Sequence, residues 1–311
     1  MQKTVAFTIA SKNFLSFVHV LHSSLSKYHP EIDFYCVLCD DPEGLDVKSL
    51  PFEVIFIEGL GIPSIEAMKV NYNITELNTA LKPFAFSTIF GRHPGAAVLY
   101  FDPDILVLSR MSELLDAIQS GANAVLTPHI TEPAEHAEMS GQAFLRYGIY
   151  NLGFCGLRDT SETRRVVSWW GRRLEKECVI DLPNGLFVDQ KWADLLPAFV
   201  ADTKILRHPG YNVAYWNLSQ RKVVRREGAW LVNGLPLRFF HFSGGSAEDS
   251  APFSRHSKMF TMARIGDAKH LVLDYRAQVQ EAGYKKYKAM PYAYSCNAAS
   301  GQNERTLQVG D

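Results

Sequence analysis

Two aspartates separated by one proline, Asp102 and Asp104, stand inside a strongly apolar stretch, AAVLYFDPDILVLSR at residues 96–110. In extended backbone, side chains two residues apart point to the same side, so both carboxylates share one side. Burying both without a partner is costly, because the charges repel and lose their hydration. Pro103 has no N–H, which places the pair at a strand end or a sheet edge. Such a pair is a hard-oxygen site that suits Mg²⁺ or Mn²⁺.

The same tripeptide also has a purely structural interpretation, because Asp-Pro-Asp is favourable in a β-turn. A D-x-D pattern alone is a weak indicator of a metal site. The flanking residues favour the metal interpretation, since an ordinary solvent-exposed turn rarely lies between two apolar runs such as 96–101 and 105–108.

Composition and charge exclude some classes of protein. The chain has 311 residues, of which 47% are hydrophobic and 21% charged, which is enough for one large α/β domain or two smaller ones. The net charge of −1 and the pI near 6.8 give no overall field for nucleic acid. The local basic clusters favour solvated faces and are also compatible with peripheral membrane contact. They lie at Arg164-Arg165, Arg172-Arg173, Arg221-Lys222 and Arg225-Arg226.

The cysteines and the N-terminus indicate a protein of the cytoplasm. Cys36 and Cys39 form a C-x-x-C inside a strand-like run, with no second pair to close a zinc site, so buried reduced thiols are favoured. No apolar run approaches the ~18 residues that a membrane span needs. The apolar residues 4–10 are followed by polar residues 11–13, which predicts a first strand and not a signal peptide.

Strands and helices alternate along the first half of the chain, which predicts an open, mostly parallel sheet flanked by helices. The apolar patterns predict strands at 4–10, 33–39, 53–57 and 96–101, and helices at 14–28, 75–90 and 111–119. Pro83 should kink or divide the second helix. In such sheets, ligands bind beyond the carboxyl ends of the strands, where Asp102 stands.

The second half is less regular, and its pattern predicts one core domain with a C-terminal extension. Further strands are expected at 123–129 and 150–158, helices at 160–178 and 189–196, and a late strand in RFFHFSGG, residues 238–245. The residues from about Ser295 onward are small and polar, and we expect a mobile tail there.

VLYFDPDILVL resembles the D-x-D strand of nucleotide-sugar glycosyltransferases of the GT-A fold, in particular the family-8-like group that includes glycogenin and bacterial galactosyltransferases. The resemblance extends from about Thr4 to Gly245, through TIASKNFLSFVHVLHSSL, ELNTALKPF, YNLGFCGL, FVDQKW, GYNVAYWN and FFHFSGG in the same order. It implies a single GT-A-type, Rossmann-like domain over 1–265. Within it, about 1–125 would form a nucleotide-binding half and 126–265 an acceptor and metal half. A helical extension and tail would occupy 266–311.

The resemblance implies a metal-dependent glycosyltransferase that retains the anomeric configuration. The donor would be a nucleotide-diphosphate sugar, with a UDP-sugar favoured over a GDP-sugar, and the acceptor a saccharide, a lipid-linked glycan or a protein. Three alternatives stay open: a non-catalytic binding protein, a nucleotidyltransferase, and a glycosidase with paired carboxylates. The segment ASKNFLS lacks the glycine-rich loop typical of a nucleotidyltransferase.

His241 lies between Phe240 and Phe242 and would by default be a core histidine. In a strand the phenylalanines point away from its side, and the strand ends at Gly244, where backbone can approach a phosphate. The resemblance implies that His241 completes a Mn²⁺ or Mg²⁺ site with Asp102 and Asp104.

The sequence does not decide which positively charged side chain contacts the diphosphate. Members of the resembling group often carry K-P-W after the H-F-x-G segment, whereas this chain has SAEDSAPFSRHSK. Arg255, Lys258 and Lys82 are the candidates. Lys82 lies on an otherwise apolar helix face, so it could equally extend along that face to solvent.

The resemblance places Asp189 against sugar hydroxyls and Gln190 near the reacting carbon, although Asp189 could be only a helix N-cap. Asn151 has an amide suited to a sugar, and Gly153 lets backbone come close; a bulge is the structural alternative. At the end of the first strand, Ala10, Ser11 and Asn13 should face the nucleotide. Relatives often have an aspartate where Ser11 stands.

Two further sets of residues have open roles. Asp40 or Asp41, at the end of the second strand, could hold a base or ribose, or could be turn residues before Pro42. An acceptor groove with aromatic walls is one interpretation of four side chains, and core packing is the other. They are Trp192, Tyr211, Tyr215 and Trp216.

Overall fold

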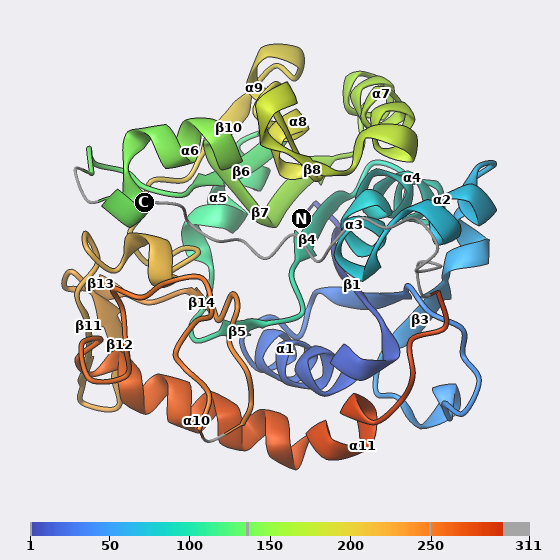
Figure 1. Ribbon diagram of the computed structural model, residues 1–311. Helices are drawn as coiled ribbons and strands as arrows, with labels where there is room; N and C mark the ends of the chain where they lie inside the picture. The colour runs from blue at the N-terminus through green and yellow to red at the C-terminus, as the bar shows by residue number, and fades with distance from the viewer. Residues whose placement is uncertain (1, 135–136, 249, 295–311) are drawn as a thin grey trace.

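A computed structural model describes residues 2–134, 137–248 and 250–294. A seven-stranded sheet forms its centre (Figure 1). In spatial order its strands are β10 (Thr203–Ile205), β6 (Ala124–Pro128), β7 (Tyr150–Arg158), β4 (Ala97–Phe101), β1 (Thr4–Ala10), β2 (Asp33–Leu38) and β3 (Glu53–Phe56). All neighbours are parallel except β7, which is antiparallel to β4 and β6. The prediction of a mostly parallel α/β sheet is confirmed.

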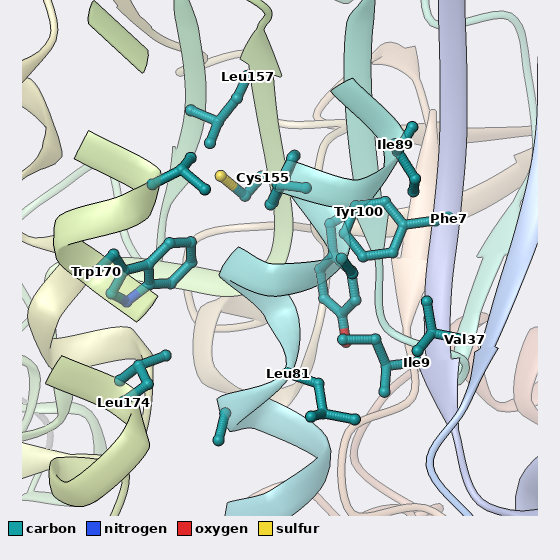
Figure 2. Packing of buried hydrophobic residues seen from close by; sticks show 14 of the residues in the cluster. Phe7, Ile9, Val37, Leu81, Ile89, Tyr100, Cys155, Leu157, Trp170 and Leu174 are labelled. Atoms are coloured by element: carbon teal, nitrogen blue, oxygen red, sulfur yellow. The ribbon is translucent and has the colours of Figure 1, made fainter. Parts of the chain in front are cut away.

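Helices cover both faces of this sheet, so the central strands are buried on both sides. One face carries α2 (Ile65–Asn71), α3 (Ile74–Ala80), α4 (Lys82–Arg92) and α7 (Ser161–Glu177); the other carries α1 (Leu15–Tyr28) and α5 (Ser112–Gln119). Side chains alternate along each strand between two apolar cores. Phe7 and Tyr100 pack in the first core, which lies between the sheet and the helices α2, α3, α4 and α7. Ala6 and Leu99 pack in the second core, on the face covered by α1 and α5. Figure 2 shows part of the first core, with Trp170 of α7 beside the strand residues.

The helix expected at 75–90 is divided, as Pro83 predicted. It forms α3 and α4, and Pro83 lies in the first turn of α4, where a missing N–H costs little. Asn73 caps α3 by accepting hydrogen bonds from the backbone N–H groups of Thr75 and Glu76.

A second layer packs beside α1. The short strands β5 (Ile105–Val107) and β14 (Phe239–His241) pair antiparallel, and β11 (Val223–Arg226), β12 (Ala229–Val232) and β13 (Leu235–Pro236) form a small sheet. The C-terminal extension forms α10 (Ala268–Glu281) and α11 (Tyr284–Lys288), and both helices pack on α1 (Figure 1). Phe242 stacks on Tyr275 of α10 with ring centroids 3.7 Å apart. The tail expected from Ser295 lies outside the described residues.

Shorter elements complete the second half. They are α6 (Gly141–Tyr147), α8 (Gln190–Ala193), α9 (Leu196–Phe199), β8 (Ile180–Asp181) and β9 (Leu186–Phe187). The single helix expected at 189–196 is therefore two short helices. Among the described residues, no helix combines the length and the apolar character that crossing a membrane requires.

The cysteines behave as buried thiols. Cys36, Cys39, Cys155 and Cys178 are free and buried, which confirms the prediction for the C-x-x-C pair. Burial raises the pKa of Cys36 to about 12, so this thiol is protonated at neutral pH and is a poor nucleophile or metal ligand.

Truncating Trp170 should destabilise the fold strongly. The side chain is fully buried between α7 and the sheet, so Trp170→Ala should lower the free energy of unfolding by about 3–5 kcal/mol. Trp170→Phe should cost much less, because the indole Nε1 has no hydrogen-bond partner among the described residues. Urea unfolding followed by circular dichroism measures both, and equal losses would contradict this packing.

Candidate metal and donor site

The turn after β4 and the pairing of β5 with β14 bring the predicted metal ligands together. β4 ends at Phe101, and the turn closes where the N–H of Ile105 donates to the carbonyl of Asp102 at 3.2 Å. Across the ladder, His241 lies opposite Ile105. The N–H of Phe242 also donates to the carbonyl of Asp104 at 2.9 Å, which continues the pairing past the strand end. A histidine remote in sequence is thereby placed beside the aspartates.

Asp102, Asp104 and His241 offer ligand atoms that all lie within 4.8 Å of one another. Nε2 of His241 is 3.1 Å from Oδ1 of Asp104 and 3.5 Å from Oδ2 of Asp102. The Tyr100 hydroxyl donates to Oδ1 of Asp102 at 2.5 Å, so each carboxylate has at least one partner. Two carboxylate oxygens and one imidazole nitrogen suit Mn²⁺ or Mg²⁺. The donor set therefore fits the expected ion.

Gly153 is required by the position of His241. A Cβ at residue 153 would lie 2.3 Å from Cε1 of the His241 ring and 2.8 Å from Oδ1 of Asn151. The carbonyl of Gly153 also accepts a hydrogen bond from the N–H of Asp102 at 2.8 Å. The sequence predicted a close approach to substrate here, whereas the structure shows that the ring of His241 fills this space.

Asn212 sets the tautomer of His241. Its Nδ2 donates to Thr127 Oγ1 at 2.9 Å and to Asn151 Oδ1 at 3.0 Å, which leaves Oδ1 facing Nδ1 of His241 at 3.2 Å. Nδ1 must then carry the proton and donate it, so in the neutral ring Nε2 presents its lone pair to the aspartates. Sequence reasoning matched the segment GYNVAYWN but gave Asn212 no role. Its backbone φ of 51°, which asparagine tolerates, leaves no mark in the sequence.

Lys82 lies in the protein interior and pairs with Asp189. It is 1% exposed, and its Nζ bonds to Asp189 Oδ2 and donates to the carbonyl of Leu152 at 2.8 Å. The same Nζ is 4.1 Å from the ring centroid of Tyr100. The alternative in which Lys82 extends to solvent is therefore wrong. With Asp189 as its partner, Lys82 is also a poor candidate for the diphosphate.

Asp189 is not a side-chain cap, which corrects the structural alternative for this residue. It stands at the N-cap of α8, but its carboxylate makes no capping hydrogen bond and pairs with Lys82. Val188 before it has a φ of 41°, a strained conformation for a β-branched residue. Burial raises the pKa of Asp189, and the nearby Lys82 charge opposes that increase.

Gln190 and Asn151 are joined in one hydrogen-bond network. Gln190 Oε1 accepts from the N–H of Leu152 at 3.1 Å and from Asn151 Nδ2 at 3.3 Å, while its Nε2 donates to the carbonyl of Tyr147 at 2.8 Å. These bonds tie α8 to β7. Because Asn151 also bonds to Asn212, the network runs from Gln190 to His241.

The charges of the triad depend on one another. Burial raises the pKa of Asp102, against the opposing fields of Lys82 and His241. Burial alone would lower the pKa of His241, but the carboxylates of Asp104 and Asp102 outweigh it, and the pKa is raised. A proton on His241 therefore neutralises part of the acidic pair. A divalent cation bound there would compete with that proton, so its affinity would fall as the pH decreases.

At the end of β1, Ala10 and Ser11 are buried, and Ser11 Oγ donates to Asn13 Oδ1 at 2.8 Å. Asp40, two residues after β2, is buried and already has several hydrogen-bond partners. Its carboxylate accepts hydrogen bonds from the N–H groups of Lys12, Asp41 and Ala293. The suggestion that Asp40 holds a base or ribose is therefore unsupported.

Asp41 and the last described residues of the C-terminal extension both lie near the carboxyl end of β2. Asp41 Oδ1 accepts from the N–H of Glu43 at 2.6 Å, which is turn chemistry. The hydroxyl of Tyr292 is 4.0 Å from Cys39 Sγ, and the Tyr294 ring centroid is 4.6 Å from Lys69 Nζ. The chain therefore returns from α11 to cover the carboxyl end of β2, an arrangement that sequence reasoning missed.

The glycine loop after β14 is closed by the segment 254–256. Ser254 Oγ donates to the carbonyl of Ser243 at 2.8 Å, and the N–H of Arg255 donates to the carbonyl of Gly244 at 3.0 Å. A Cβ on Gly244, whose φ is 69°, would lie 2.4 Å from Cδ2 of His256. Burial, and then the Arg255 charge, lower the pKa of His256 to about 4, so this ring is neutral at pH 7.

For two of the four aromatic side chains, the structure favours core packing over an acceptor groove. Tyr211 is buried, and its hydroxyl donates to Glu113 at 2.9 Å. Trp216 is also buried, with its ring edge-on to His241 at 5.2 Å between centroids. Trp192 is partly buried against the first core, and Tyr215 lies 5.9 Å from the His256 ring. Only Tyr215 remains both near the triad and partly exposed.

Comparison with solved structures identifies the fold. Two structures of the galactosyltransferase LgtC, one with donor and acceptor sugar analogues and one of an active-site mutant, align with 89% of this chain and 95% of theirs. The TM-score is 0.56 and the sequence identity 14% in both cases. At this identity the likeness shows the fold alone. The fold is the GT-A fold, as expected from the sequence.

Sequence comparison finds more similar but less informative relatives. The Uncharacterized protein YfnD of Bacillus subtilis is 26% identical over 234 residues, which cover 73% of this chain and 72% of YfnD. The Uncharacterized protein YfnF of the same organism is 23% identical over 243 residues, covering 76% of this chain and 80% of YfnF. No known family profile matches the chain.

Adding a methyl group at Gly153 should weaken metal binding. Gly153→Ala displaces the His241 ring, so the affinity for Mn²⁺ measured by isothermal titration calorimetry should fall about 10–100-fold. Gly91→Ala is the matched control, because a Cβ there meets no atom within 4 Å and alanine suits the interior of α4. Unchanged affinity in Gly153→Ala would contradict the role given to His241.

The free energy of unfolding should decrease as the pH is lowered, in part because of His129. This buried ring bonds to the carbonyl of Ile149 and to Asn151, and burial lowers its pKa from 6.5 to about 4. Between these values the unfolded chain binds a proton that the folded chain does not. Stability therefore decreases as pH falls through this window, by at most about 1.4 kcal/mol per pH unit from this residue.

Urea unfolding in EDTA at pH 7 and pH 4.5 measures the effect. His129→Gln should show a smaller loss of stability between the two pH values than the wild type. His270→Gln, which changes an exposed residue of α10, should keep the wild-type loss. Identical pH dependence in His129→Gln and the wild type would count against this assignment.

Proposed function

We propose that this chain is a metal-dependent glycosyltransferase that moves a sugar from a nucleotide-diphosphate donor to a saccharide, lipid-linked or protein acceptor. One observation carries the proposal: Asp102, Asp104 and His241 converge within 4.8 Å at the carboxyl edge of a GT-A sheet. The complex of LgtC with donor and acceptor sugar analogues supports the same class of substrates. A UDP-sugar is favoured over a GDP-sugar.

Asp102, Asp104 and His241 would hold Mn²⁺ or Mg²⁺, which when bound supplies Lewis-acid stabilisation of the charge on the departing diphosphate. The protein's own contribution is to preorganise these ligands. Asn212 holds the proton of His241 on Nδ1, and Tyr100 donates to Asp102. Both contacts are made before substrate arrives, so little reorganisation is needed during the reaction.

Arg255 is our choice for the protein cation that meets the diphosphate. One divalent ion does not neutralise two carboxylates and a diphosphate together, so a further positive charge is required. Lys82 is committed to Asp189, whereas Arg255 is exposed and forms no ion pair with a described residue. Its backbone is fixed against Gly244, at the loop where a phosphate can approach.

Retention at the anomeric carbon is part of the proposal. Inversion needs a carboxylate base beside the acceptor, but Asp189 is buried and paired with Lys82. We therefore assign Asp189 and Gln190 to the donor-sugar side, where Gln190 orients Asn151. Ala10, Ser11 and Asn13 would face the nucleotide, and the site would lie between a nucleotide-binding half (1–125) and an acceptor half (126–265).

The cellular setting belongs to the same proposal. A cytoplasmic enzyme would meet nucleotide-sugar donors where they are abundant, and a lipid-linked acceptor would place it at a membrane surface. The exposed Arg172 and Arg173 of α7 supply positive charge for such contact. Nothing in this arrangement calls for nucleic acid as a partner.

Nucleotide binding should depend on metal and on Asp104. In a thermal-shift assay, UDP or GDP with Mn²⁺ should raise the Tm of the wild type, and excess EDTA should abolish the shift. Asp104→Asn should lose most of the metal-dependent shift and lower sugar transfer about 10²–10³-fold, because the donor set is incomplete. Asp274→Asn, an exposed change on α10, is the matched control and should behave as the wild type.

Each outcome separates the candidate functions. Full transfer activity in Asp104→Asn or in excess EDTA would overturn the metal site. Metal-dependent nucleotide binding without transfer to any acceptor would favour a non-catalytic binding protein. Absence of any nucleotide-dependent shift would overturn the donor class itself.

A further inference from the structure

Arg221 is a buried cation without an anion. It is 3% exposed, and its Nη1 donates to the carbonyl of Tyr211, while its Nε has no hydrogen-bond partner. No described carboxylate forms an ion pair with it. Burial lowers its pKa to about 10, which still leaves the guanidinium charged at neutral pH. A buried charge is normally paired, so this one calls for a partner.

Arg221 lines a cavity of about 570 Å³ between the small sheet of β11 and β12 and the start of α10. Lys222 and Arg264 also line it, against a single carboxylate, Asp267. Asp267 Oδ2 is 3.4 Å from the backbone N–H of Arg225, which donates to it. The cavity also includes Gly266, two residues before the first residue of the 14-residue helix α10, whose N-terminus adds partial positive charge. Positive charge therefore dominates the lining.

This cavity is separate from the metal triad. Val223 and Phe260 line it, and both belong to the apolar cluster that contains Phe240. Phe240 precedes His241 in β14, and adjacent strand residues point to opposite sides. The cavity therefore lies behind the strand whose other side presents the third metal ligand.

We infer that this cavity is an oxyanion site that binds a phosphate group through Arg221. The planar guanidinium suits two oxygens of a tetrahedral anion, and Arg221 lines the cavity without a carboxylate partner among the described residues. The group could come as free phosphate or as a phosphate ester, and both present the same oxygens to Arg221. The inference does not depend on the proposed transferase activity.

Thermal shift with inorganic phosphate tests the site, at constant ionic strength and in EDTA. The variants are Arg221→Gln and, as matched control, Arg225→Gln, which changes an exposed arginine of the same small sheet that lies over the Trp230 ring. Phosphate should raise the Tm of the wild type and of Arg225→Gln. The apparent affinity should fall at least about tenfold in Arg221→Gln. If that variant does not fold, Arg264→Gln, an exposed change in the lining, should weaken binding several-fold.

Glycerol 3-phosphate is the second probe. An equal response to both probes supports a free-phosphate site, and a larger response to the ester supports a site for phosphate esters. No shift of the wild type with either probe, or identical shifts in Arg221→Gln and Arg225→Gln, would overturn the inference. Asp104→Asn should keep the phosphate response, so failure of the transferase proposal and failure of this one are distinguishable.

Discussion

The site depends on the antiparallel pairing of β5 with β14. This short ladder places His241 opposite Ile105, directly after the second aspartate, and the N–H of Phe242 extends it to Asp104. The pairing is stabilised from its other side, where Phe240 and Phe242 pack in an apolar cluster with Tyr275 of α10. Burial of those rings therefore helps to hold His241 beside the aspartates, and α10 of the C-terminal extension contributes to this arrangement through Tyr275.

The interior beside that ladder contains charges that neutralise one another. Asp102 and Asp104 face His241, and Asp189 faces Lys82. Two carboxylates so close would repel, and an interior lysine would be costly alone, but each group has an opposite partner. Preorganisation and stability are thus coupled, because removing one partner leaves a buried charge without compensation. The amide network of Asn151, Gln190 and Asn212 then fixes orientation without adding charge.

The segment 211–221 contributes residues to both sides of β14. Asn212 reaches the metal triad, while Arg221, a few residues later, lies in the cavity behind the strand. The two residues are linked through backbone, since Arg221 donates to the carbonyl of Tyr211, next to Asn212. The guanidinium of Arg221, which has no carboxylate partner among the described residues, contrasts with Lys82, which is paired with Asp189. Lys82 is therefore part of the folded interior, whereas Arg221 is the side chain that we propose binds an external anion.

The sequence by itself determined the alternating strands and helices through apolar periodicity. Proline chemistry determined the division at Pro83 and the position of the D-P-D turn at a strand end. All of these features depend on neighbours in sequence. The resemblance of six short segments added the prediction that His241 is a metal ligand. Only the tertiary structure decided that Lys82 pairs with Asp189, that Gly153 makes room for an imidazole and that Ala293 donates to Asp40. An apolar pattern specifies which face of an element is buried, but not which distant polar groups meet there, since that depends on how the elements pack.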